Sequence, residues 1–170
     1  MKARQCSLVM ALALSLCGCA GYRLGPTNGM AAREKSVQVN TFSNTTLQPR
    51  LGDALIQQMR KQLQRDGTFR LATHGDGDII ISGVITRYDR FELSFSSQDV
   101  LTGRDYRLLM TAQVTATERG SGKVIFDQPV SGNTLIRIGS DLTSAERQAL
   151  PLLAEDLARR VTALLADGTW

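Results

Sequence analysis

The alternation of apolar and polar residues from 106 to 117 restricts what this chain can fold into more than any other feature. Successive side chains of a β-strand point to opposite faces of a sheet, so the alternation predicts a strand with one buried and one accessible face. The apolar face carries Tyr106, Leu108, Met110, Ala112, Val114 and Ala116, and the polar face carries Arg107, Thr111, Gln113, Thr115 and Thr117. We therefore expect a sheet that is covered on one side and that meets water or a polar partner on the other.

Two segments with helical periodicity provide this cover. The first has Leu51, Leu55, Met59 and Leu63 four residues apart, with Pro49 suited to the start of a helix and Gly67 to its end. The second opens with the capping-box pattern Thr143-Ser144-Ala145-Glu146 and continues with an apolar stripe of Leu150, Leu153, Leu157, Val161 and Leu164. Pro151 lies inside the second segment and predicts a kink or a restart of the helix there.

Three further segments complete the predicted sheet. Residues 36–42 alternate, residues 79–88 are rich in β-branched side chains, and residues 124–130 follow the tight turn ERGSGK. The order is strand, helix, three strands, helix. Two helices with one apolar stripe each and a sheet with one apolar face predict an α+β fold. We expect a two-layer α/β sandwich with both helices on one face of a four-stranded mixed sheet.

The beginning of the chain has the features of a secretory signal peptide. Lys2 and Arg4 precede an apolar run over residues 6–16, which is too short to span a bilayer as a helix. Leu16-Cys17-Gly18-Cys19 resembles the bacterial lipobox. It predicts cleavage before Cys19 and attachment of a diacylglycerol and an N-acyl chain (palmitate) to that cysteine. The alternative is an ordinary signal peptide with an incidental cysteine.

Cleavage divides the chain into a signal peptide (1–18), a lipidated tether (19–35) and a single domain (36–170). It lowers the net charge from +4 to +2, because Lys2 and Arg4 are lost with no acidic residue. So small an excess of cations does not indicate a nucleic-acid partner. Ala20 stands where Asp commonly retains a lipoprotein in the inner membrane. We therefore expect export to the outer membrane.

His74 is the only histidine, so a catalytic Ser-His-Asp or Cys-His arrangement would depend on it. His74, Asp76 and Asp78 alternate in the sequence and offer one side of a metal site. Metal sites usually draw ligands from separated elements, and no second cluster exists. We expect a turn leading into a strand, with no catalytic residue, no metal and no cofactor. A lipid-modified hydrolase or metalloenzyme centred on His74 is the competing hypothesis.

Four arginines fall at the end of one predicted strand and the start of the next: Arg87, Arg90, Arg104 and Arg107. If these strands pair as a hairpin, the guanidinium groups converge near one edge, where they can bind phosphate. The alternative is a solvated hairpin whose local acids (Asp89, Glu92, Asp99 and Asp105) nearly cancel the charge. Phe91 and Phe95 favour a contact surface, because these apolar side chains in a polar loop need a partner to cover them.

The order and spacing of these segments resemble the lipopolysaccharide (LPS) assembly lipoprotein family LptE. The resemblance rests on GCAGYRLG after the lipobox, VQVNTFSNTTLQPRLGDALIQQMRKQLQ, DGDIIISGVITRY, DYRLLMTAQVTATERGSGKVIF and the final amphipathic helix. It covers essentially the whole chain after the signal peptide. It implies a two-layer fold anchored in the inner leaflet of the outer membrane and facing the periplasm.

The same resemblance implies a plug inside the β-barrel translocon LptD that binds LPS. Arg104 is the nearest match to a basic LPS-contacting position of the family at the hairpin tip, and Arg107, Arg87 and Arg90 are its neighbours. The candidates for contact with the barrel are Thr111, Gln113, Thr115, Thr117, Phe91 and Phe95. The rival interpretation is another periplasmic lipoprotein adaptor, such as a cell-wall synthase activator or a secretion-pore subunit.

Overall fold

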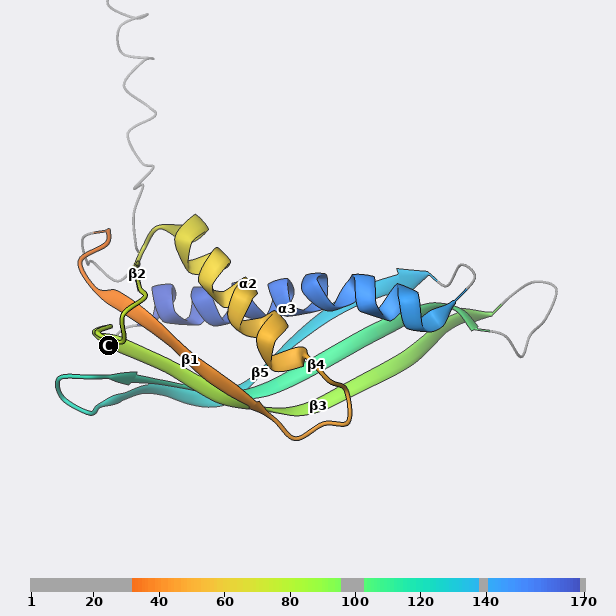
Figure 1. Cartoon of the computed structure of the whole chain (residues 1–170), viewed down its shortest axis with the longest axis horizontal. Coiled ribbons are helices and arrows are strands. Elements are labelled where there is room, and N and C mark those ends of the chain that lie inside the picture. The colour runs from red at the N-terminus through yellow and green to blue at the C-terminus, as the bar shows by residue number, and fades with distance from the viewer. Residues whose placement is uncertain (1–31, 96–102, 138–140, 169–170) are drawn as a thin grey trace, which may run out of the picture.

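The computed structural model describes residues 32–95, 103–137 and 141–168, and the side chains of residues 94, 95, 103 and 104 lie outside the described part. The elements in chain order are β1 (Ser36–Asn44), α2 (Leu51–Asp66), β2 (Arg70–Ala72), β3 (Ile79–Phe95), β4 (Gly103–Glu118), β5 (Val124–Arg137) and α3 (Leu142–Asp167). Both helices lie on one face of a curled sheet (Figure 1). The predicted α+β fold with two helices on one face is confirmed.

The sheet has five strands in the order β2-β1-β3-β4-β5, so the prediction of four strands is wrong. The additional strand β2 pairs with β1 at only three positions, from Ser36↔Arg70 to Gln38↔Ala72. So short a strand shows no measurable alternation in the sequence. Strand β1 runs parallel to β2 and β3, whereas β4 runs antiparallel to β3 and β5, which makes the sheet mixed.

Helix α2 follows the predicted pattern. Its four buried residues are Leu51, Leu55, Met59 and Leu63. The helix ends at Gly67, whose φ of 75° lies in the left-handed region that glycine adopts without strain. The Gly67 N–H donates to the carbonyl of Leu63 at 3.3 Å. The apolar stripe therefore faces the sheet along the whole helix.

Helix α3 begins differently from the prediction. Its N-cap is Asp141, whose carboxylate accepts the N–H groups of Thr143 at 3.1 Å and Ser144 at 2.9 Å. The predicted capping box is therefore wrong, because an ionised carboxylate at the N-cap already satisfies these amides. Glu146 therefore does not cap the helix. It is buried and forms an ion pair with Arg90 of β3 at 3.0 Å.

Helix α3 is continuous through Pro151, so the predicted restart is absent. Pro151 is exposed, whereas Leu150 and Leu153 on either side of it are buried. The hydrogen bond that proline cannot donate therefore lies on the solvent side of the helix, where water replaces it. No helix in the described part of the chain is both long and apolar enough to span a membrane.

The core lies between the sheet and the helices. The apolar face of β4 is fully buried at Leu108, Met110, Ala112, Val114 and Ala116. Helix α3 approaches the backbone of β5 at Gly132, where a Cβ atom would lie 2.6 Å from the Leu157 nitrogen and 2.8 Å from the Leu153 carbonyl oxygen. Only glycine allows a helix to approach a strand so closely.

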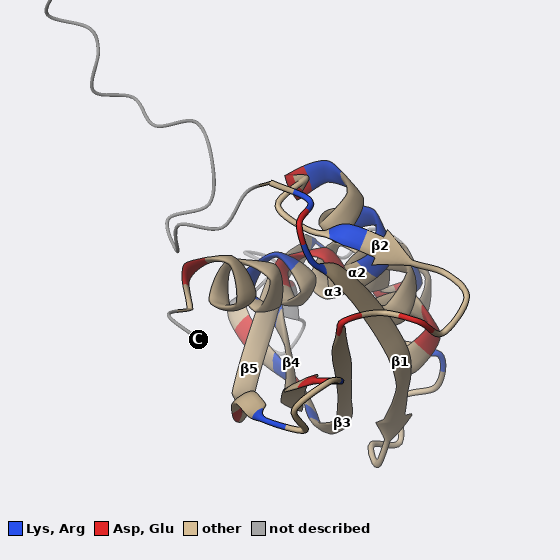
Figure 2. Cartoon of the chain, turned by 90° about the vertical axis from the view of Figure 1, so that its left-hand side faces the viewer, with Lys and Arg blue, Asp and Glu red and all other residues tan. Residues whose placement is uncertain are grey.

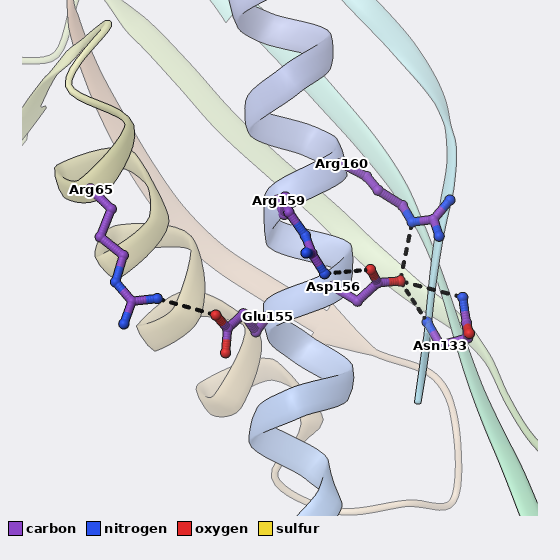
Figure 3. A network of polar contacts seen from close by, with 6 residues as sticks. All are labelled: Arg65, Asn133, Glu155, Asp156, Arg159 and Arg160. Carbon is purple, nitrogen blue, oxygen red and sulfur yellow. Dashed lines mark hydrogen bonds and ion pairs between the residues drawn. The ribbon is translucent and has the colours of Figure 1, made fainter. Parts of the chain in front are cut away.

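Polar contacts fasten α3 to both of its neighbours (Figure 3). The Asp156 carboxylate accepts the backbone N–H of Asn133 on β5 at 3.0 Å. It also pairs with Arg159 at 2.8 Å and with Arg160 at 3.1 Å. On the other side, Arg65 of α2 pairs with Glu155 of α3 at 3.1 Å. Burial would raise the pKa of Asp156, but the Asn133 N–H and the Arg160 guanidinium outweigh it and lower that pKa.

Candidate functional site

The candidate site is the face of the sheet opposite the helices, which we call the open face. The register of β4 places Thr111, Gln113, Thr115 and Thr117 on this face, as predicted. Their neighbours on β5 are also polar: Thr111 Oγ1 lies 2.8 Å from Ser131 Oγ, and Gln113 Nε2 donates to Asp127 at 2.6 Å. Thr115 donates to the same Asp127 oxygen at 3.2 Å. These cross-strand pairs form a polar surface that extends from β4 onto the edge strand β5.

The end of the open face near the β3–β4 connection is more apolar. Phe91, Arg107 and Leu135 are direct cross-strand neighbours on β3, β4 and β5. Phe91 is 45% exposed and Leu135 is 63% exposed. Leu93, next along β3, is 47% exposed. Large apolar side chains gathered around an arginine form a surface that a partner with apolar and anionic parts can cover.

Strands β3 and β4 form the predicted antiparallel hairpin, but its register places the arginines on different faces of the sheet. Arg87 pairs in register with Thr111 and Phe91 pairs with Arg107, so Arg87 and Arg107 lie on the open face. Arg90 pairs in register with the buried Leu108, so it lies on the helix-covered face. An irregularity between Ile85 and Arg87 shifts the alternation of β3. The expected convergence of all four arginines is therefore corrected.

Ion pairs account for two of these arginines. Arg87 pairs with Asp89 on the same strand, and Arg90 pairs with Glu146 of α3. Arg107 is exposed and has no ion pair within the described residues. The side chains of Arg104 and Phe95 lie outside the described part. The open face therefore presents Arg107, with Arg87 beside the carboxylate of Asp89.

A polar cluster lies beneath the first turns of α3, on the helix-covered face. Burial raises the pKa of Tyr88 to about 12, and the negative charge of Glu146 adds to the shift. The Tyr106 hydroxyl donates to Glu92, which raises the pKa of Tyr106. Arg90 and Glu146 belong to this cluster, and the exposed Arg90 guanidinium neutralises the buried Glu146 carboxylate. The sequence pattern did not predict this cluster, because the bulge that places Arg90 on the helix-covered face has no local signature.

Hydrogen bonds hold the segment around His74 against β1 and the end of β4. The Asp78 carboxylate accepts the Ser36 hydroxyl at 2.6 Å and the Ser36 N–H at 2.8 Å, and these bonds lower its pKa. Arg119 donates to the carbonyls of Gly77 at 2.7 Å and Gly75 at 2.8 Å. His74 is exposed, and its Nδ1 lies 3.0 Å from the hydroxyl oxygen of the neighbouring Thr73.

Within the described ranges, no group of three or more His, Cys, Asp or Glu side chains is placed to hold a metal ion. Asp78 directly precedes β3, and its hydrogen bonds to Ser36 join the start of β3 to the start of β1. Cys19, the predicted lipid attachment site, lies outside the described residues.

Comparisons with known proteins identify relatives by sequence pattern and by fold. The family model described as "LptE: Lipopolysaccharide-assembly" matches residues 34–165. No curated protein matches the sequence. The fold is similar to that of protein CT253 from Chlamydia trachomatis, with a TM-score of 0.58 and 11% identity over 80% of this chain and 98% of that chain.

Two further solved structures have a similar fold. Protein XCC0632 from Xanthomonas campestris has a TM-score of 0.56 and 11% identity, over 85% of this chain and 91% of that chain. A minor lipoprotein from Acinetobacter baumannii has a TM-score of 0.52 and 14% identity, over 78% of this chain and 92% of that chain. At these identities the likeness concerns the fold alone.

Proposed function

The chain belongs to the LptE family of lipopolysaccharide-assembly proteins, and from this premise we propose that it plugs and stabilises an LptD-type β-barrel translocon. In this role it assists LPS assembly at the outer membrane and catalyses no reaction. The family is one of cofactor-free lipoproteins. The observation that carries the proposal is the family match over residues 34–165, together with a sheet whose open face is uncovered by the chain's own helices.

The chemistry of the open face supports a barrel as the partner. The interior of a large outer-membrane barrel is polar. Thr111, Gln113, Thr115 and Thr117 are short polar side chains at half-buried positions, so a barrel wall can approach them closely. The Asp127 carboxylate beside them already accepts hydrogen bonds from Gln113 and Thr115. Phe91 and Phe95 are proposed to lie at the margin of this contact.

We propose that Arg107 and Arg104 bind the phosphate groups of LPS. Arg107 is exposed between Phe91 and Leu135, so one ligand with phosphate and acyl parts can occupy the arginine and the apolar side chains together. Arg87 is a weaker candidate because it is paired with Asp89, and Arg90 supports the proposal least because it pairs with the buried Glu146.

The anchor and the location follow from the same proposal. Residues 1–18 are removed, Cys19 carries the acyl chains, residues 19–35 form the tether and residues 36–170 form the domain. More than one acyl chain gives stable attachment. The protein is then held in the inner leaflet of the outer membrane and faces the periplasm.

Co-purification from detergent-solubilised outer membranes tests the barrel partner. The wild-type chain should retain a β-barrel protein. A Gln113→Arg/Thr115→Arg variant should lose it, because two long cations on the open face prevent close contact. The matched control is Gln57→Arg/Gln64→Arg, which adds the same charge at exposed positions of α2. Capture of a peptidoglycan synthase or a secretion pore in place of a barrel contradicts the proposal and favours the rival adaptor.

Binding to LPS micelles tests the arginines separately. An Arg104→Glu/Arg107→Glu variant should bind at least about tenfold more weakly, since each lost arginine–phosphate contact is worth more than about 1 kcal/mol. Unchanged binding would remove both residues from the site without affecting the barrel result.

A further inference from the structure

The end of the domain where the described chain begins is rich in cations. The Arg33 N–H donates to the Thr68 carbonyl at 2.8 Å, which joins the start of the described chain to the segment after α2. The exposed cations around this junction are Arg33, Arg60, Lys61, Arg65 and Arg70, and we call them the basic end. Figure 2 shows Lys and Arg segments gathered over the last turns of α2 and over β2, beside the point where the chain enters.

Few of these charges are neutralised inside the fold. Within the described ranges, only Arg65 of the five forms an ion pair, with Glu155 of α3 at 3.1 Å. Two acids of the same end, Glu34 and Asp66, are exposed and offset part of the charge, but the five cations outnumber them. Other acids there have partners inside the fold. Glu118 pairs with Lys35 at 2.8 Å, and Asp78 is bonded to Ser36. The basic end therefore presents a net positive surface to whatever lies beside it.

The position of the basic end relative to the tether indicates the partner. Ala32 follows Cys19 by thirteen residues, which span at most about 45 Å when fully extended. An acylated Cys19 therefore holds the basic end within that distance of a membrane surface. Polybasic segments next to a membrane anchor bind anionic lipid headgroups, at about fivefold in affinity per basic residue.

We propose that the basic end docks on the anionic phospholipid headgroups of the membrane that holds the anchor. The inference rests on the proposed lipidation of Cys19 for its place in the cell, but the contact itself needs no acyl chain. The far ends of β3 and β4 lie at the opposite end of the sheet from the chain entry (Figure 1), so the contact leaves that end available to the barrel and to LPS.

Vesicle binding tests the contact. Every helix and strand that the structure describes lies between Ser36 and Asp167, so a chain that begins at Ala20 keeps all of these elements and carries no acyl group. It should sediment with phosphatidylcholine vesicles that contain about one third phosphatidylglycerol, and not with phosphatidylcholine alone. Raising the salt concentration from about 50 mM to about 200 mM should weaken the binding, because the cations are exposed.

Charge reversal locates the contact. An Arg60→Glu/Lys61→Glu/Arg70→Glu variant should partition onto anionic vesicles on the order of a hundredfold more weakly. The matched control, Arg50→Glu/Arg137→Glu/Arg147→Glu, makes the same change in net charge at exposed positions away from the basic end, and it should keep most of the binding. Thermal unfolding checks that both variants are folded, and Gln in place of Glu serves if a reversed variant is not.

Two results would overturn the proposal: equal binding to neutral vesicles, or equal loss in the variant and its control. The vesicle assay uses no acyl chain, barrel or LPS, so its failure leaves the proposed function standing. Conversely, an unmodified Cys19 would overturn the proposed anchoring and leave the vesicle result unchanged.

Discussion

Asp78 shows how one carboxylate joins two strands that are far apart in the sequence. Its side chain accepts two hydrogen bonds from Ser36, and the Ser36 hydroxyl in turn accepts the Asp78 N–H at 3.0 Å. The pair lies where the parallel strands β1 and β3 begin, so it fixes the register between them. In an antiparallel pair a tight turn sets the register. Here a short polar side chain at the start of a strand sets it.

The lowered pKa of Asp78 makes this contact sensitive to pH. Because the folded-state pKa lies below the unfolded value of about 3.9, the stabilisation is fully present above that value. It is lost as the pH falls through the folded pKa. We expect Asp78→Asn to lower the free energy of unfolding by about 1 kcal/mol at neutral pH, a modest figure because the group is exposed. Urea unfolding at pH 7 and at pH 3 measures the difference, which should shrink at the lower pH.

Asp76→Asn is the control for this experiment, since it removes the same charge two residues away. Among the described residues, none forms a hydrogen bond with the Asp76 side chain, which is exposed. A similar loss of stability in both variants would show that the charge of the segment matters and the Ser36 contact does not.

At the scale of the elements, the close packing of α3 against β5 depends on Gly132. A methyl group there would meet the backbone of α3 at Leu153 and Leu157, which cannot move aside as a flexible side chain can. We expect Gly132→Ala to lower the free energy of unfolding by about 1–3 kcal/mol through overpacking. Chemical denaturation measures this loss. Gly120→Ala, in the β4–β5 turn with no atom within 4 Å of its Cβ position, should leave stability nearly unchanged.

The helices and the longer strands were predictable because each has a clear period. The four buried residues of α2 recur every four positions, and the alternation of β4 matches its burial. The predictions of burial and strand register failed where one residue or a few break the regular period. A register shift between Val39 and Phe42 places Phe42 in the core and leaves Thr41 exposed, against the simple alternation.

The candidate site was predictable only in part for the same reason. The polar positions of β4 follow from a regular alternation, so their common face could be predicted. The arginines of β3 come after an irregularity at Ile85, which turns Arg87 outward and Arg90 inward. The ion pair between Arg90 and Glu146 joins residues far apart in sequence, and no local pattern predicts which partner a buried carboxylate takes.

At the scale of the whole molecule, function depends on where the chain is held. The proposed acyl group on Cys19 is separated from the fold, so its removal should not affect the core. We expect a Cys19→Ala variant to fold normally but to be released from the membrane fraction by a high-salt wash, which weakens the contact of the basic end and leaves the acylated wild type attached. Membrane fractionation followed by mass spectrometry of the first residue measures this effect. Membrane attachment of the variant equal to wild type would show that another feature holds the protein there.

The contact between Asp156 and the Asn133 amide affects how crowded copies of this chain behave. Edge strands with free amides recruit further strands and start aggregation. Here a carboxylate from the chain's own helix occupies an amide near the middle of the β5 edge. A neighbouring copy that slides along this edge meets a charged obstacle in place of a continuous template. The β5 edge therefore offers a second copy of this chain an interrupted row of backbone amides.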